Sequence, residues 1–502
     1  MGAVSETLEK ERLSHAEKTS ESHKKDLGQY LTPYNIAKYM AYLFPETDQE
    51  MNILDPGAGI GTLSCALIDR AKAEKWNNPK INVTAYDLDK AVLNNLNDNL
   101  IASGKGTKNF SYQILNEDFL EKTSFEYSFG TNEQFTHVIM NPPYKKILTK
   151  SAAREYTRLF GLETVNLYSA FVGASIALLK ENGYLVAIVP RSFCNGPYYK
   201  PFRKFILKNC SIKHIHLFES RNKAFKDESV LQENIIIMLQ KGTGQGNVEI
   251  SYSSDADFSD LQKKPFEFNS IVNPSDKEKY FNIPLSSQKN KNVYFENGND
   301  FISLKETGAN VSTGTIVDFR AKDYIRKEPE VDTVPLLYPV HFRHFRTDWP
   351  KDSKKPNAIL NTDVTAPMFA PAGFYVVVKR FSTKEEQKRI VASLISADDI
   401  KTPAFAFENH LNVFHENKKG LPKDIAYGLT VWLNTTFLDE QFRLFSGHTQ
   451  VNATDLRNLP YPTTSKLIDM GKQLENYKDW NQQLFDSIAM ESIIAKRRAV
   501  NF

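Results

Sequence analysis

The most restrictive feature of this sequence is a regular alternation of short apolar runs and helical patterns between residues 26 and 240. The apolar runs are rich in β-branched residues, which favour strands, and the segments between them repeat apolar residues at helical spacing. Seven runs have this character: 52–55, 81–87, 110–118, 136–141, 184–190, 212–218 and 234–240. The alternation predicts a doubly wound, mostly parallel α/β sheet, because parallel strands need helical crossovers that cover both faces.

The length and a change of pattern divide the chain. At 502 residues it exceeds what one hydrophobic core usually organises, so two domains are expected. The glycine-rich segment KGTGQGN ends the alternation, and beyond it turn residues and isolated aromatics dominate, with one final helix at about 465–498. We predict a polar N-terminal extension at 1–25, a catalytic domain at 26–245, a connecting segment at 246–302 and a second, mixed α/β domain at 303–502.

Composition excludes several classes of protein. No apolar run approaches the roughly 20 residues that span a bilayer, and the polar first residues lack the apolar centre of a signal peptide. A cytoplasmic protein is therefore expected. Three cysteines form neither a disulfide framework nor a zinc cage, so no metal is expected. A net charge of +3 means that any surface for nucleic acid must be a local concentration of cations.

A glycine-rich loop, DPGAGIG at 55–61, joins a predicted strand to a predicted helix. Glycines there let a ligand approach the backbone, and the helix start offers unpaired N–H groups. The dinucleotide fingerprint G-x-G-x-x-G fails, because its third glycine would fall on Thr62. The spacing D-x-G-x-G-x-G is instead typical of sheets that bind S-adenosylmethionine. We therefore expect Asp55, Gly57 and Gly59 to belong to a site for that cofactor.

Two acidic residues end the next two predicted strands. Asp87 can accept the ribose hydroxyls of an adenosine, and Asp118 can accept its adenine amino group, with Phe119 packed beside the ring. Each acid taken singly is more typical of a helix cap or a solvated loop. The expectation depends on three strand ends in register, since open α/β sheets bind ligands outside the carboxyl ends of their strands.

The tetrapeptide NPPY at 141–144 follows an apolar strand directly. The Asn141 side-chain oxygen and the Pro142 carbonyl can both accept from one exocyclic amino group. Such a nitrogen is a poor nucleophile because its lone pair is delocalised, and two fixed acceptors would aim that lone pair at a methyl donor. Tyr144 supplies an aromatic face for stacking a flipped base. A rigid proline turn without catalytic function is the alternative reading of this motif.

Other chemistries find less support. No Pro-Cys dipeptide is present, so the cysteine nucleophile of cytosine-C5 methyltransferases is absent. His214 and His216 alternate with apolar residues on a predicted strand, which is more typical of a polar strand face than of a metal site.

Residues 26–240 resemble the gamma class of N6-adenine DNA methyltransferases, the TaqI-like group, in the order of their motifs. LGQYLTP resembles the first cofactor motif, which implies that Thr32 contacts the methionine end of S-adenosylmethionine. NLYSAF implies that Phe171 packs on the cofactor adenine. The segment 224–239 resembles a hairpin that would present Phe225 to the flipped base, with Phe218 as the competing candidate.

The second domain resembles the target-recognition half of type II modification enzymes of the PstI and BsuBI kind. The resemblance is carried by STGTIVDFR, VPLLYPVHFR, ENHLNVFH and FSGHTQVNATDLRNLPYP, among other segments. It implies double-stranded DNA as substrate, methylation of the adenine in CTGCAG, and a separate restriction endonuclease as functional partner.

The same domain contains cations interleaved with aromatic and amide side chains. Arginine can pair with guanine, and glutamine with adenine, in the major groove. Lys384, Lys388 and Arg389 are expected to contact phosphates. The candidates for DNA contact are Arg343, Arg346, Lys379, Arg380, Lys384, His448 and Gln450.

Three other functions stay open at this point. NPPY also occurs in methyltransferases that act on RNA or on a protein glutamine, but those chains lack a large C-terminal recognition domain. An inactive DNA-specificity subunit is a second alternative, against which the intact motif residues argue. A fused nuclease is a third, although no convincing PD…(D/E)-x-K arrangement is present.

Overall fold

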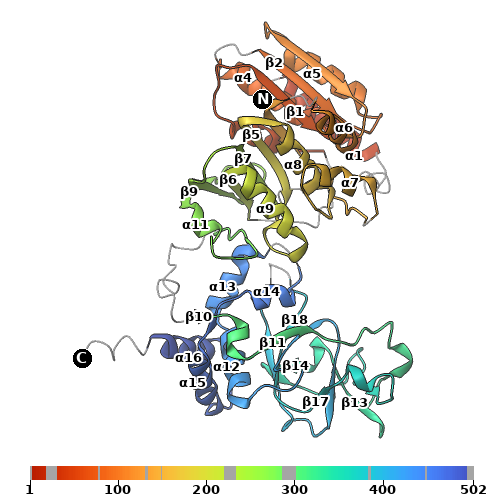
Figure 1. The fold of residues 1–502 in the computed structure, drawn as a ribbon, viewed down its shortest axis with the longest axis vertical. Helices are drawn as coiled ribbons and strands as arrows, with labels where there is room; N and C mark the ends of the chain where they lie inside the picture. Colours follow the sequence, from red (N-terminus) through yellow and green to blue (C-terminus); the bar gives the residue numbers. More distant parts are fainter. Residues whose placement is uncertain are drawn as a thin grey trace, which may run out of the picture. The chain divides into compact units, whose positions relative to one another are not determined.

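The computed structural model describes residues 3–18, 31–76, 80–130, 134–148, 150–219, 233–284, 301–382, 386–446 and 449–494. The chain forms two compact units, Met1–Ser286 and Ser287–Phe502 (Figure 1). Across the described ranges, no helix combines the length and the apolar character needed to cross a membrane.

The first unit is built on a nine-stranded sheet with the order β3-β2-β1-β4-β5-β7-β6-β8-β9. The five strands from β3 to β5 are parallel, and β7 runs antiparallel to both of its neighbours. The predicted doubly wound, mostly parallel sheet is thus confirmed. Its strands are β1 Met51–Pro56, β2 Ile81–Tyr86, β3 Phe110–Leu115, β4 Phe135–Met140, β5 Leu179–Pro190, β6 Cys210–Phe218, β7 Asn234–Lys241, β8 Asn247–Ser253 and β9 Gln262–Glu267.

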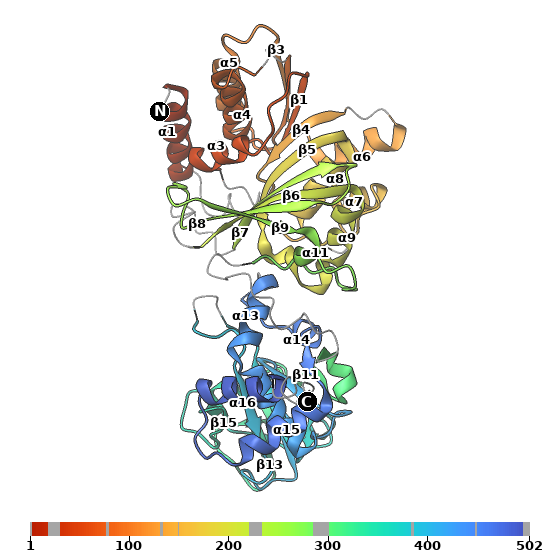
Figure 2. The same ribbon diagram turned by 90° about the vertical axis from the view of Figure 1, so that its left-hand side faces the viewer.

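Helices cover both faces of this sheet (Figure 2). Successive residues of β4 point to opposite faces, so Ile139 packs in one core, and Val138 and Met140 pack in the other. The first core includes α1 Ala3–Lys18, α3 Tyr34–Tyr42, α4 Thr62–Ala73 and α5 Leu93–Gly104. The second includes α6 Phe119–Phe129, α7 Ala152–Leu159, α8 Leu167–Leu178, α9 Lys200–Asn209 and α11 Phe268–Ile271.

The structure differs from the expected connecting segment at 246–302. Residues 247–267 form β8 and β9, which extend the sheet of the first unit beyond β6. Val248, Ile250 and Tyr252 are buried at alternate positions, and this period of two is the signature of a strand. Polar residues separate these apolar positions, so the segment as a whole is polar and was predicted to be a connection.

The second unit contains two mixed sheets with the orders β11-β21-β18-β19-β15-β14 and β12-β16-β13-β20-β17, and a small pair, β10-β22. Its strands are β10 Phe301–Ile302, β11 Asn310–Thr313, β12 Ile325–Arg326, β13 Thr333–Leu337, β14 Phe342–Arg343, β15 Arg346–Thr347, β16 Ala358–Leu360, β17 Ala370–Pro371, β18 Tyr375–Lys379, β19 Ala392–Ile395, β20 Ala404–Phe407, β21 Leu411–His415 and β22 Tyr461–Pro462. Its helices are α12 Lys423–Leu433, α13 Thr436–Phe445, α14 Ala453–Arg457, α15 Thr464–Glu475 and α16 Gln482–Ile494.

The single final helix expected at about 465–498 is wrong. The segment forms two helices, α15 and α16, and residues 476–481 separate them. Asn481 explains the new start, because its Oδ1 accepts the backbone N–H of Leu484 at 2.9 Å. Trp480 beside it is buried, so the interruption contributes to the core of this unit.

A buried network of polar side chains links α3 to β6 and β8 in the first unit. The hydroxyl of Ser251 lies 2.7 Å from Nε2 of His214 and 2.8 Å from Nδ1 of His216. The Tyr39 hydroxyl lies 2.7 Å from the same serine oxygen. Burial lowers the pKa of His214 to about 4 and that of His216 to about 3. Both rings are therefore neutral parts of the fold at neutral pH.

Acid should remove the stability that these two neutral histidines contribute to this unit. A histidine with a lowered pKa in the folded state stabilises the fold above its unfolded pKa of 6.5 and loses that contribution as the pH falls toward the folded value. At pH 5 each such ring should cost about 2 kcal/mol. Asp55 acts in the opposite direction, because its raised pKa lets the folded state take up a proton in the same range, so the histidine contribution is measured as a difference. Between pH 7 and pH 5 we expect the thermal midpoint of His216→Gln, which cannot ionise, to change less unfavourably than that of the unchanged chain. An unchanged pH dependence of the midpoint in His216→Gln would remove this histidine from the explanation.

Candidate active site

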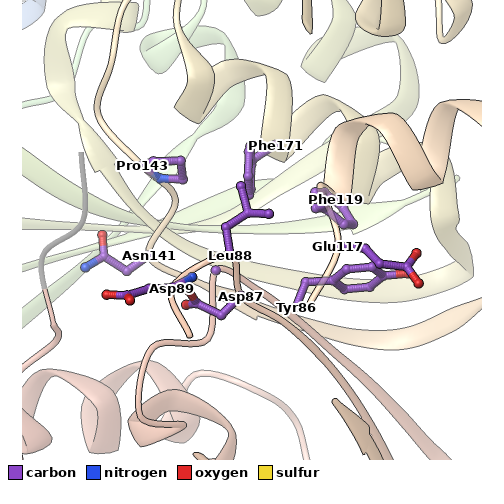
Figure 3. A pocket seen from close by; sticks show the side chains of 10 residues that line it. Tyr86, Asp87, Leu88, Asp89, Glu117, Phe119, Asn141, Pro143 and Phe171 are labelled. Carbon is purple, nitrogen blue, oxygen red and sulfur yellow. Dashed lines mark hydrogen bonds between the residues drawn. The ribbon is translucent and has the colours of Figure 1, made fainter. Parts of the chain in front are cut away.

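A pocket of about 510 Å³, measured to its open mouth, lies at the carboxyl ends of the parallel strands (Figure 3). In Figure 3, Asn141 lies at one end of the pocket, and Tyr86 and Glu117 lie at the other. The lining residues are Gly57, Tyr86, Asp87, Leu88, Asp89, Glu117, Phe119, Asn141, Pro143 and Phe171.

The glycine loop between β1 and α4 contributes Gly57 to the lining of the pocket. Gly57 has a φ of +81°, and a Cβ there would lie 4.0 Å from Cε1 of Phe171, in space that the pocket leaves open. Gly59 has a φ of +57°, and a Cβ there would come within 2.5 Å of Leu31. Only glycine combines these backbone angles with such a close approach. The loop therefore keeps a backbone surface exposed to a ligand.

Asp55 ends β1 beneath this loop and is completely buried. Its Oδ2 accepts from the Ser64 hydroxyl at 2.6 Å, whereas its Oδ1 has no hydrogen-bond partner among the described residues. Burial raises the pKa of this carboxyl to about 7. A buried acceptor without a partner is costly, and a cationic ligand nearby would favour the ionised form of Asp55.

Three carboxylates line the pocket itself: Asp87, Asp89 and Glu117. Asp87 holds the loop in place, because its Oδ2 accepts the Gly59 N–H at 2.7 Å and its Oδ1 accepts the Asp89 N–H at 2.8 Å. Burial raises the pKa of Asp87. None of the ten lining residues is Lys, Arg or His. The lining thus favours a neutral or cationic ligand over one that carries phosphates.

Aromatic rings, tilted relative to one another, form an apolar wall on one side of the pocket. Phe119 and Phe171 lie 5.1 Å apart between ring centroids, and Tyr86 packs edge-on against Phe119 at 5.2 Å. Phe119 follows β3 and Phe171 comes from α8, so the fold brings together two aromatics that are 52 positions apart in the sequence. Such a wall suits a planar ring.

Asn141 comes directly after β4, and its carboxamide is held in one orientation. Its Nδ2 donates to the Thr32 hydroxyl at 3.1 Å, so its Oδ1 is the acceptor side of the group. The Tyr144 hydroxyl lies 2.9 Å from that Oδ1 and 3.1 Å from the carbonyl of Ile188. Pro142 is buried and Pro143 lines the pocket. The site thus contains a fixed amide oxygen beside a ligand pocket.

The structure places the remaining predicted residues of this unit differently. Asp118 caps α6, since its Oδ1 accepts the N–H groups of Leu120 and Glu121, and the neighbouring Glu117 lines the pocket in its place. Phe225 lies outside the described residues. Sequence reasoning missed Leu88 and Asp89, which directly follow a predicted strand, and Glu117, which lies at the end of another. Leu88 is 54% exposed, which is unusual for leucine and marks the rim of the pocket.

A second pocket, of about 600 Å³ to its open mouth, lies in the C-terminal unit. It brings together the predicted contact Lys379 and three aromatic residues that are interleaved with the predicted cations, Phe342, His344 and Phe345. Arg343 is exposed, and Arg346 lies over the Trp480 ring at 3.9 Å from its centroid.

The other predicted contacts of that unit have varied environments. Arg380 donates to the Asn409 carbonyl at 3.2 Å. Gln450 is half-buried, and its backbone forms an isolated antiparallel β-bridge with Phe381. Lys384 and His448 lie outside the described residues. The expectation for Arg389 is wrong, because its side chain is 2% exposed and its Nε donates to Ser382.

Lys388 is also unsuited to a phosphate contact. Its ammonium donates to the carbonyl of Asn434 and to the side chain of Gln482 at 2.8 Å. Burial lowers the pKa of this lysine to about 8. Lys388 therefore joins α12 to α16 inside the unit.

The bond between Thr32 and Asn141 predicts a graded pair of variants. Thr32→Val removes the acceptor that orients the carboxamide, whereas Thr32→Ser keeps it. For the methyl transfer expected from the sequence, Thr32→Val should lower kcat roughly three- to tenfold, the scale of one neutral hydrogen bond. Thr32→Ser should retain most of the parental kcat. Titration of S-adenosylmethionine separates this role from a direct cofactor contact: a loss of cofactor affinity with unchanged kcat would contradict a positioning role.

Comparisons with known proteins agree with this geometry. A family model described as Eco57I restriction-modification methylase matches residues 33–225. The Type II methyltransferase M.BsuBI of Bacillus subtilis is 43% identical over 505 residues, which cover 99% of each chain. The Type II methyltransferase M.PstI of Providencia stuartii is 38% identical over 482 residues, which cover 94% of each chain. A solved structure of a DrdV–DNA complex has a similar fold, with a TM-score of 0.51, 15% identity, and coverage of 93% of this chain and 59% of that chain.

Proposed function

This chain belongs to the type II methyltransferases of restriction–modification systems, and we propose that it methylates the N6 amino group of an adenine flipped out of duplex DNA. The observation that carries the proposal is the Asn141 carboxamide, which is fixed by Thr32 at one end of a carboxylate-lined pocket. The palindrome CTGCAG, which the sequence resemblance implies, is the target we propose, and a cognate restriction endonuclease is the functional partner.

S-adenosylmethionine is the cofactor that suits this pocket. Its sulfonium and ammonium charges match a lining with three carboxylates and no basic residue. Asp87 would accept the ribose hydroxyls while it holds the Gly59 N–H. The adenine would lie against Phe119 and Phe171. Glu117 takes the place of Asp118 as the carboxylate of that end, and Gly57 leaves room for the methionine part.

The chain's own residues then prepare the target nitrogen. The bound cofactor supplies the methyl group from its sulfonium. Asn141 Oδ1 and the Pro142 carbonyl would accept the two amino hydrogens and direct the nitrogen lone pair toward the pocket. A carboxamide oxygen can accept more than one hydrogen bond, so Asn141 can take the Tyr144 hydroxyl and the amino group together. The Tyr144 ring would stack on the flipped base, and Phe225 is proposed as its second aromatic partner.

We propose that the second unit recognises the target sequence. Arg343, Arg346, Lys379, Arg380 and Gln450 supply cations and amides suited to base edges and phosphates. Lys384 and His448 stay candidates from the sequence. The alternatives, methylation of RNA or of a protein glutamine, require the same fixed acceptor but no separate duplex-reading unit.

A substrate competition tests the proposal. The purified chain is incubated with tritiated S-adenosylmethionine and equal amounts of duplex DNA, transcribed RNA of the same sequence and a glutamine-containing protein mixture. We expect label on duplex DNA alone. Label on RNA or protein would favour the alternatives, and no label on any of them would favour an inactive specificity subunit. Asn141→Ala, which leaves the second unit unchanged, is the matched control for enzymatic transfer.

A further inference from the structure

A short hairpin in the second unit combines an unfavourable backbone conformation in its turn with two like charges that face each other across its strands. Strands β14 and β15 pair Phe342 with Thr347 and Arg343 with Arg346, so only His344 and Phe345 form the turn. Their φ angles are +48° and +65°. Turns of this kind are normally built from Asn-Gly or Asp-Gly, because side chains disfavour the left-handed region. Such strain in non-glycine residues concentrates at functional sites.

The charged side chains of the hairpin are also placed unfavourably. Arg343 and Arg346 are direct cross-strand partners, and like charges in that position destabilise a sheet. Among the described residues neither guanidinium lies within 4.0 Å of a carboxylate. Asp348, which forms its ion pair with Lys351 at 2.9 Å, interacts with Arg343 only at longer range, where the arginine charge helps to lower the pKa of Asp348. Two facing arginines beside a strained turn therefore lower the stability of the isolated unit, and an external hydrogen-bond acceptor would offset that cost.

The hairpin is nevertheless fixed by contacts with β19 and α16. The Phe345 carbonyl accepts the Leu394 N–H of β19 at 2.9 Å, and the Thr347 hydroxyl donates to the Leu394 carbonyl at 3.0 Å. The Phe345 ring packs edge-on against Phe485 of α16, with centroids 4.8 Å apart. Arg346 stacks on Trp480. The tip is thus a fixed platform, which is the arrangement that selective recognition requires.

The exposed side chains of the tip present donors only. Arg343 Nε donates to His344 Nε2 at 3.1 Å, so His344 accepts at Nε2 and carries its proton on Nδ1. This contact leaves the terminal N–H groups of Arg343 and the Nδ1–H of His344 facing outward, since both residues are exposed. Two neighbouring acceptors, O6 and N7, on the major-groove edge of guanine match such a donor set.

We infer that the hairpin from Phe342 to Thr347 reads a guanine in the major groove, with Arg343 and His344 as specificity-determining residues. The inference rests on the proposed function, because it takes duplex DNA as the substrate. β14 is the edge strand of its sheet and β15 also pairs with β19, so we assign the contact with the groove to the tip of the hairpin. Lys379, which lines the adjoining pocket with His344, is placed to contact the flanking phosphate backbone.

Selection of duplexes from a randomised DNA library tests this role through binding, without reference to methylation. The full chain is compared with Arg343→Lys, which keeps the charge but loses the forked donors, and with His344→Gly, which suits the backbone and removes the imidazole. Arg320→Lys, an exposed arginine of the same unit, is the matched control. We expect the unchanged chain and the control to enrich one guanine-containing motif.

Both hairpin variants should lose discrimination at one guanine position by roughly ten- to a hundredfold. His344→Gly should do so without a lower thermal midpoint, which separates recognition from folding. Unchanged enrichment in both variants would overturn the inference, as would an equal loss of affinity for every sequence, which indicates a phosphate contact, or the absence of any enriched motif for the unchanged chain. Sequence-selective binding without methyl transfer would overturn the proposed function and leave the hairpin's role standing.

Discussion

Replacing Asn141 with alanine should lower kcat for methyl transfer about a hundred- to a thousandfold, the usual loss for one preorganised electrostatic partner. The substitution removes one acceptor for the target amino group and one polar side chain from the end of the pocket, and it leaves the glycine loop, Asp87 and the second unit unchanged. Because that interaction forms mainly in the transition state, the loss should appear in kcat, with little change in the affinity for cofactor or DNA.

Single-turnover transfer of a tritiated methyl group to duplex DNA measures this loss. Thr32→Ser is the control, since it changes a neighbour of Asn141 without removing an acceptor from the target. Transfer by Asn141→Ala at close to the parental rate would contradict the mechanism, whatever the substrate. A loss confined to DNA binding would instead assign Asn141 to holding the flipped base.

The second large effect is expected at Asp87. Asp87→Ala should weaken S-adenosylmethionine binding about ten- to a hundredfold, because a charge-assisted hydrogen bond is lost at roughly 1.5–3 kcal/mol. The alanine also releases the N–H groups of Gly59 and Asp89, so the glycine loop should lose part of its order. Asp87→Asn keeps one side-chain oxygen and should show a smaller loss.

Isothermal titration of the cofactor checks this expectation. Asp98→Ala, an exposed carboxylate on α5 of the same unit, is the matched control and should bind like the unchanged chain. Parental affinity in Asp87→Ala would remove Asp87 from the cofactor site. A lower melting temperature without a change in affinity would assign it to the loop alone.

Much of the catalytic unit could be predicted because its signals are local. Each apolar run predicts a buried parallel strand, and parallel strands bring their carboxyl ends to one edge of the sheet. Gly57, Asp87, Phe119, Asn141 and Phe171 were proposed from separate segments, and all five line one pocket. Their assembly follows from strand order, which the alternation of strands and helices already constrains.

The remaining features depend on tertiary contacts. The sequence could not tell whether Asp118 faces a ligand or caps α6, since both use the same residue at the same place. It could not show that Arg389 is buried, because a charged side chain enters a core only where a partner such as the Ser382 hydroxyl accepts its hydrogen bond. The residue types of His344 and Phe345 do not predict a left-handed turn, because side chains disfavour that conformation. The contacts of Phe345 with β19 and α16 stabilise the turn.

The central claim is tested most directly by the chemical identity of the methylated base. Genomic DNA from a methylation-free bacterial strain that expresses this chain is digested to nucleosides and analysed by mass spectrometry, beside DNA from cells that express Asn141→Ala. The account predicts N6-methyldeoxyadenosine with the unchanged chain and little or none with the variant. Methylated cytosine in place of adenine, no methylated nucleoside at all, or an equal yield from Asn141→Ala would contradict it.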